Sequence, residues 1–100
     1  LCVIALFASE FCSAQTVSGS GARTCHAVHD ALNNESEAAL DSFVAWSQGF
    51  VSGFNWSNVR QQDVRIDSSA LLHWLGQYCA ANPRDSVYAA VQELIRLNAR

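Results

Sequence analysis

In four stretches between residue 25 and the end of the chain, apolar residues recur at spacings of three and four. This periodicity is the feature that most limits the possible folds, because it places apolar side chains on one face of an α-helix. No stretch shows the sustained alternation of apolar and polar residues that is typical of a half-buried strand. The length of 100 residues suits one domain. The sequence therefore predicts an all-α fold, a small bundle of about four helices.

Residues that cap or break helices set the expected limits of the first two. One helix is expected over residues 25–32 and is ended by Asn33-Asn34. The longest is expected over residues 36–57, where the Ser36 hydroxyl is a suitable N-cap.

The second half of the chain is predicted in the same way. The polar stretch 58–66 lacks a helical period and is expected to form a surface loop. Asp67 is then expected to cap a third helix. Asn82-Pro83 is expected to end that helix and to start the fourth, because proline suits the first helical position. In this interpretation Asn82 caps the fourth helix.

The N-terminal residues differ from the rest. Residues 1–8 form an unbroken apolar run, too short for a bilayer, which needs about 20 such residues. Cys12-Ser13-Ala14 places small residues at the −3 and −1 positions of a signal-peptidase site. The alternative is a buried N-terminal helix. We expect three segments: a signal peptide at 1–14 whose own start precedes Leu1, a flexible leader at 15–24, and a helical domain at 25–100.

Removal of such a signal peptide leaves two cysteines, Cys25 and Cys79. The signal peptide predicts a periplasmic or secreted location, and an even pair of cysteines in an exported protein predicts a disulfide. For the loop that a bond between Cys25 and Cys79 would close, the chain-entropy model gives a stabilisation of roughly 4 kcal/mol. Two buried free thiols in a cytosolic protein are the alternative.

The central helix holds the most distinctive spacing. Gly49 and Gly53 lie four residues apart, on one helical face. A glycine inside a helix costs up to about 1 kcal/mol relative to alanine, so the pair predicts that another helix backbone packs closely there. Trp46, Phe50 and Phe54 would wall that contact. A groove for a small molecule, opened by the glycines, is the alternative.

No sequence motif for catalysis or for a cofactor is present, so we expect no enzymatic activity. His26, His29 and His73 do not complete a recognisable metal-ligand pattern and are interpreted as surface histidines. After residue 14 there are six arginines, no lysine and eight acidic residues, a net charge near −2. The absence of a basic patch argues against nucleic acid and against a polybasic membrane contact.

Three features follow one another over residues 25–95: a cysteine at the start of the domain, an aromatic helix and a corner. The aromatic helix contains Trp46-x-x-Gly49-Phe50-x-Ser52-Gly53, and the corner is Tyr78-Cys79-Ala-Ala-Asn82-Pro83. In this order the chain resembles the HdeA/HdeB family of periplasmic acid-stress chaperones. The resemblance implies a four-helix bundle with one disulfide and a dimer at neutral pH. It also implies that acid dissociates the dimer and partly unfolds each chain. The chain then binds other periplasmic proteins and prevents their aggregation. Unlike those chaperones, this chain has no lysine.

A weaker resemblance is to the Tai-type immunity proteins of type VI secretion, which are small, exported and helical and block a peptidoglycan amidase. Their pair of cysteines near the C-terminus is missing here. Two function classes therefore stay open, with a structural envelope protein as a third. A chaperone would use Trp46, Phe50, Phe54 and Trp74 for its clients. An inhibitor would use the loop at 58–66, with Arg60 and Arg65.

Overall fold

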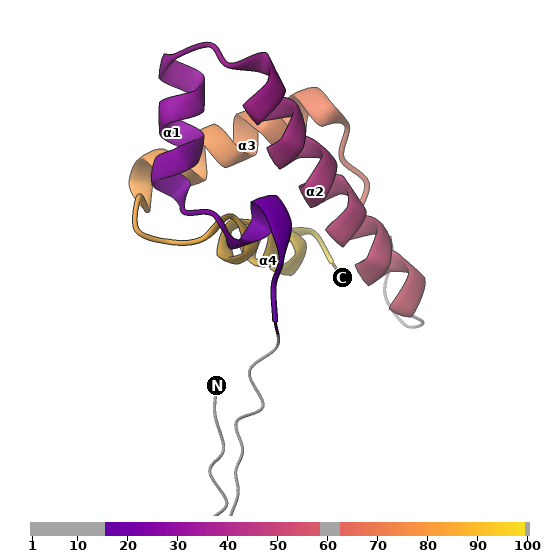
Figure 1. Ribbon diagram of the computed structural model, residues 1–100. Helices are drawn as coiled ribbons and strands as arrows, with labels where there is room; N and C mark the ends of the chain where they lie inside the picture. Colours follow the sequence, from indigo (N-terminus) through magenta and orange to yellow (C-terminus); the bar gives the residue numbers. More distant parts are fainter. Residues whose placement is uncertain (1–15, 59–62, 100) are drawn as a thin grey trace, which may run out of the picture.

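The computed structural model describes residues 16–58 and 63–99 (Figure 1). These residues form a short 3-10 helix and four α-helices, and they contain no strand beyond one isolated bridge between Thr24 and Ser86. The elements are η1 (Gly19–Ala22), α1 (Cys25–Asn33), α2 (Glu37–Ser57), α3 (Ser68–Ala81) and α4 (Val87–Asn98). The predicted all-α bundle is confirmed. The expected signal peptide at 1–14 and Arg60 lie outside the described residues.

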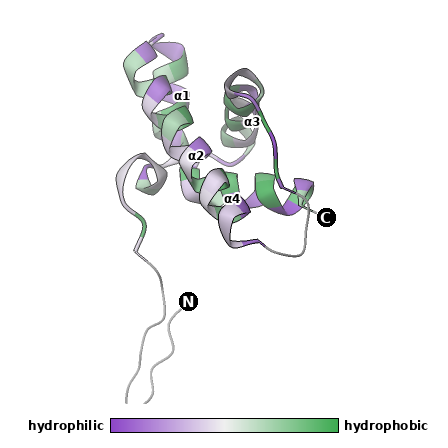
Figure 2. Ribbon diagram, turned by 90° about the vertical axis from the view of Figure 1, so that its right-hand side faces the viewer, coloured by the Kyte–Doolittle hydropathy of each residue, from purple (hydrophilic) through white to green (hydrophobic). Residues whose placement is uncertain are grey.

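The core is formed where α3 crosses the other three helices, all of which it contacts. Each helix carries both apolar and polar residues, as Figure 2 shows, which is the pattern of helices that bury one side. The largest fully buried apolar side chains come from α3, α1 and α4: Leu71, Leu75, Val28, Val87 and Val91. On α2 the buried positions are Phe43, Ser47 and Val51, four residues apart along one face.

Two of the predicted caps are confirmed. Ser36 accepts a hydrogen bond from the Ala39 amide at the start of α2. The Asp67 carboxylate accepts one from the Ala70 amide, at 2.8 Å, at the start of α3. Each side chain thereby satisfies one of the amides that a helix N-terminus leaves without an intrahelical partner.

The prediction that Asn82-Pro83 starts the fourth helix is wrong. Asn82 is the C-cap of α3, and its side-chain amide donates to the Tyr78 carbonyl at 3.0 Å. The fourth helix begins only at Val87, where the Ser86 hydroxyl caps it by accepting from the Ala89 amide. The physical reason is that the carbonyls of Pro83 and Asp85 accept hydrogen bonds from amides of α1.

The connection between α3 and α4 supplies hydrogen-bond acceptors to the first turn of α1. The Cys25 amide donates to the Asp85 carbonyl at 2.7 Å, and the His26 amide donates to the Pro83 carbonyl at 3.1 Å. Thr24, at the N-cap position, makes no side-chain capping bond. Backbone carbonyls of a distant segment therefore accept the amide hydrogen bonds that a capping side chain accepts at the start of other helices.

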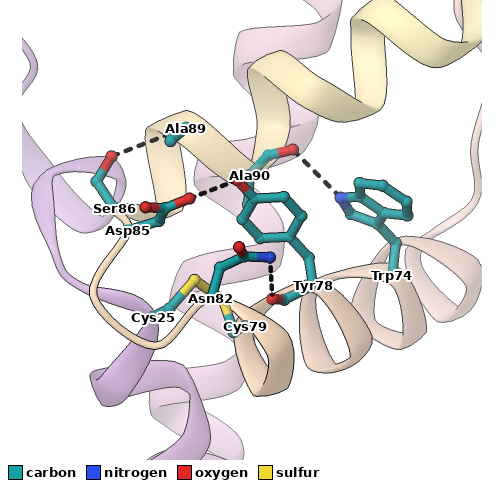
Figure 3. Close-up of a disulfide and its surroundings, with 9 residues drawn as sticks. All are labelled: Cys25, Trp74, Tyr78, Cys79, Asn82, Asp85, Ser86, Ala89 and Ala90. Atoms are coloured by element: carbon teal, nitrogen blue, oxygen red, sulfur yellow. Dashed lines mark hydrogen bonds between the residues drawn. A yellow bond between two sulfur atoms is a disulfide. The ribbon is translucent and has the colours of Figure 1, made fainter.

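A disulfide closes the same corner, as the sequence predicted. It joins Cys25 in the first turn of α1 to Cys79 near the end of α3, and both residues are buried (Figure 3). Beside it the Tyr78 hydroxyl donates to the Asp85 carboxylate at 2.6 Å. That hydrogen bond, together with burial and the negative charge of Asp85, raises the pKa of Tyr78 to about 12.

The expectation of a flexible leader at 15–24 is wrong from residue 18 onward. There η1 packs on α2 and α4, and Gly21 is buried against the indole of Trp46. Trp46 Nε1 donates to the Ser18 carbonyl at 2.9 Å. Gly19 has a φ of +74°, a conformation that other residues rarely adopt. Glycine is favoured at position 19 by this φ, and it is needed at position 21 because a Cβ atom there would overlap the Trp46 ring.

Candidate functional site: the aromatic surface of α2

The two glycines of α2 do not lie at a helix crossing, so the predicted close packing is wrong. A Cβ atom placed on Gly49 or Gly53 would meet no described atom within 4 Å beyond its own stretch of helix. The physical reason is their position on the helix. They follow the core residues Ser47 and Val51 by two positions, which is about 200° around an α-helix. Gly49 and Gly53 therefore lie on the side away from the core.

The glycines instead form the floor of a shallow hollow of about 400 Å³, at the place where their spacing allowed a small-molecule groove as the alternative. It is lined by Gly49, Phe50, Gly53, Phe54 and Ser57. A second hollow, of about 250 Å³, lies between α2 and α4. It shares the two phenylalanines and adds Gln92, Ile95 and Arg96. Phe50 and Phe54 thus form a ridge with a hollow on each side.

Ring contacts hold this ridge in place. Phe50 stacks on Trp46 with ring centroids 5.3 Å apart, and it meets the edge of Tyr88 at 5.4 Å. Such pairs contribute about 0.5–1.5 kcal/mol each beyond the area that they bury. The ridge is therefore a preformed feature, fixed by contacts to α4 and, through Trp46, to η1.

Trp56 is a functional candidate that sequence reasoning missed. Its side chain is 90% exposed, and it is the most exposed large hydrophobic residue in the described part of the chain. It lies three residues after Gly53 and so on the same side of α2. A tryptophan outside the apolar period of its helix was the available signal. We call Phe50, Phe54 and Trp56, with Gly49 and Gly53 between them, the aromatic surface.

The aromatic surface carries no charge of its own. Residues 42–59 contain no Asp, Glu, Lys or Arg. At the edge, on α4, Arg96 Nε donates to the Glu93 carboxylate at 2.9 Å. This pairing lowers the pKa of Glu93 and raises that of Arg96, which favours the ionised form of both groups at neutral pH. Contacts made by the surface itself are consequently apolar.

The two predicted binding tryptophans, Trp46 and Trp74, have structural contacts of their own. Trp46 adjoins the aromatic surface but also covers η1, as described above. Trp74 lies between α3 and α4, where its Nε1 donates to the Ala90 carbonyl at 3.2 Å (Figure 3). Both tryptophans are partly buried and hold elements together. They are available to a client only if the bundle loosens.

Part of the predicted surface loop is fixed to α2. The Asn55 side chain binds both backbone groups of Val64: its amide donates to the Val64 carbonyl at 2.9 Å, and its oxygen accepts from the Val64 amide at 2.8 Å. Gln48 donates to the Ile66 carbonyl at 2.9 Å. Val64 is buried, which the prediction of a polar loop missed. Arg65, between the two fixed residues, is exposed.

Groups of three or more histidine, cysteine or acidic side chains that would hold a metal do not occur among residues 16–58 and 63–99. His26 lies 3.5 Å from Asp30 on the exposed side of α1. Within the same ranges, no helix has the length and hydrophobicity required to cross a membrane.

The aromatic surface is thus the strongest candidate site in the part of the chain that the structure describes. Neither a family model, nor a curated protein, nor a solved structure matches this chain.

Proposed function

We propose that this chain is an exported, non-enzymatic protein that binds other proteins through the aromatic surface of α2. The observation that carries the proposal is the exposure of Trp56 beside an open glycine floor and a fixed phenylalanine ridge. Exposed tryptophan and phenylalanine next to an apolar hollow are typical of protein contact sites. The buried disulfide supports an oxidising compartment.

We further propose that the clients are unfolded proteins held in acid. At pH 2 the carboxylates are neutral, and six arginines and three histidines give a charge near +9. Repulsion among these positive charges loosens the bundle. Trp46 and Trp74 would then add to the aromatic surface, while the disulfide keeps α1 and α3 joined.

Light scattering of an aggregating client at pH 2 tests this proposal. We expect the protein to suppress aggregation and Trp56→Ala to lose much of that effect. Because Trp56 is almost fully exposed, its removal leaves the fold intact. Leu97→Ala, at a 43% exposed position of α4, is the matched control and should behave as the unmodified protein. Equal suppression by all three proteins, or none by any, contradicts the proposal.

One observation favours the second candidate, an inhibitor of a secreted amidase. Specific inhibition needs a rigid surface, and the Asn55 and Gln48 bonds hold residues 64–66 against α2 with Arg65 exposed. An amidase encoded beside this chain is the partner to test by titration calorimetry. Nanomolar binding that Arg65→Glu abolishes would establish this candidate, and absence of binding would remove it.

A further inference from the structure

We propose that the connection between α3 and α4 controls the access of thiols to the disulfide between Cys25 and Cys79. The bond is closed to reductants while residues 83–85 lie on α1. It becomes accessible when these residues detach locally, with the four helices still packed. The disulfide is then a redox-sensitive element whose reduction depends on one short segment. This inference goes beyond the proposed function, because it involves neither the aromatic surface nor a client.

The first argument is that a thiol cannot reach either sulfur in the closed structure. The exposed fraction is 0% for Cys25 and 1% for Cys79. Reduction begins when a thiolate attacks one cysteine Sγ along the axis of the S–S bond, so its rate depends on access to that sulfur. Because both cysteines are buried, an opening of the protein must come before the attack.

The second argument concerns which part of the protein opens. Val28 of α1 and Leu75 of α3 lie on the same helical faces as the two cysteines, and both are fully buried. Access from the core therefore requires the helices to separate. The connection is a surface segment instead, since its residues 83 and 84 are exposed. Figure 3 shows Asn82, at the start of this connection, beside the disulfide.

The third argument is that few bonds hold this segment. In the described part of the chain, three hydrogen bonds join residues 83–85 to α1 and α3. Two run from the Cys25 and His26 amides to carbonyls of the connection, and the third runs from the Tyr78 hydroxyl to the Asp85 carboxylate. Segments with few buried apolar contacts open more readily than a core does. Loss of three such bonds leaves about one molecule in a hundred open.

The reaction that follows the opening is a thiol–disulfide exchange. A thiolate of a dithiol bonds to one cysteine sulfur, the S–S bond breaks, and the other cysteine leaves with the bonding electron pair. The second thiolate of the dithiol then attacks the dithiol sulfur of the mixed disulfide, which releases the first cysteine. The cystine gains two electrons, and the dithiol loses two and becomes a disulfide. The covalent tie between α1 and α3 is thereby lost.

Reduction of the full chain by excess dithiothreitol at pH 8 tests the proposal. Samples are quenched with iodoacetamide, and the reduced fraction is measured by mass spectrometry. We expect reduction to be slower by about 100-fold or more than that of oxidised glutathione, whose disulfide is open to solvent. Tyr78→Phe removes one of the three bonds and should accelerate reduction about tenfold.

Two variants are the controls. Tyr88→Phe removes a hydroxyl that makes no hydrogen bond within residues 16–58 and 63–99, and it should leave the rate unchanged. Asn55→Ala removes two hydrogen bonds to Val64, far along the chain from the disulfide, and so lowers the stability of the whole bundle. If the connection opens locally, Asn55→Ala also leaves the rate unchanged. Circular dichroism checks that each variant retains the fold.

Three results would overturn the inference. A rate for the unmodified protein close to that of oxidised glutathione means that the bond is not closed to thiols. Acceleration by Asn55→Ala as large as that by Tyr78→Phe means that reduction requires unfolding of the whole bundle. Equal rates for Tyr78→Phe and Tyr88→Phe mean that the bond to Asp85 does not hold the connection in place.

Discussion

Gly21 and Gly49 should respond in opposite ways to the same substitution by alanine. A Cβ atom on Gly21 would overlap the six-membered ring of Trp46, whereas one on Gly49 would enter open space. To accept Gly21→Ala, the indole must leave the Ser18 carbonyl and its stacked position on Phe50. The hydrogen bond contributes about 1 kcal/mol and the ring pair about 1 kcal/mol, so the expected loss is about 2 kcal/mol.

Gly49→Ala should instead stabilise the protein by about 0.5–1 kcal/mol, because alanine restricts the unfolded chain and favours the helix. In a domain of this size, 1 kcal/mol changes the melting temperature by about 4–8 °C. Gly21→Ala should therefore lower the melting temperature by roughly 8–16 °C, and Gly49→Ala should raise it by a few degrees.

The assay is a thermal melt followed by circular dichroism, with all proteins at the same concentration. Near-ultraviolet signal from Trp46 reports whether the indole has moved. Unchanged stability of Gly21→Ala would refute the close contact between η1 and α2. A loss of stability in Gly49→Ala equal to that in Gly21→Ala would refute the open position of the α2 glycines.

Three further outcomes are expected. Ser86→Ala should lower the free energy of unfolding by about 1 kcal/mol through loss of the α4 cap, and no effect in a denaturant melt would contradict the assigned helix start. Asn55→Ala should cost about 2 kcal/mol, since two hydrogen bonds to Val64 are lost, and faster exchange of the Val64 amide should accompany it. Tyr78 stays protonated in the fold up to a pKa of about 12, so its contribution to stability is complete below pH about 10 and is lost as pH rises through about 12. The difference in stability between the unmodified protein and Tyr78→Phe should therefore shrink in that range, and a constant difference would rule out the bond to Asp85.

Local signals were enough to predict the starts of α2 and α3. Ser36 and Asp67 cap through their own side chains, within three residues, so the sequence around each contains the whole interaction. The start of α4 depends on contacts far along the chain. Asn82-Pro83 fits a helix start by local rules, but residues 83 and 85 are held by amides of α1. No local pattern reports such a bond.

The glycines show a different kind of error. The spacing of Gly49 and Gly53 correctly predicted that both lie on one face of a helix. It did not indicate whether that face is turned toward the core or away from it. Comparison with the buried positions Phe43, Ser47 and Val51 would have separated the two sides. Gly21 appeared to belong to a leader because its neighbours are small and polar, and only the position of Trp46 explains why it is glycine.

The bonds from α1 to residues 83 and 85 bear on the order in which the chain can fold as it is synthesised. A protein emerges from the ribosome N-terminus first, and early segments often fold before later ones appear. Here α1 depends on residues 79–85, which supply both its hydrogen-bond acceptors, Pro83 and Asp85, and, at Cys79, its covalent partner. A nascent chain that stops before residue 83 therefore lacks these acceptors, and α1 completes its hydrogen bonds only after α3 and the start of the connection to α4 have been synthesised.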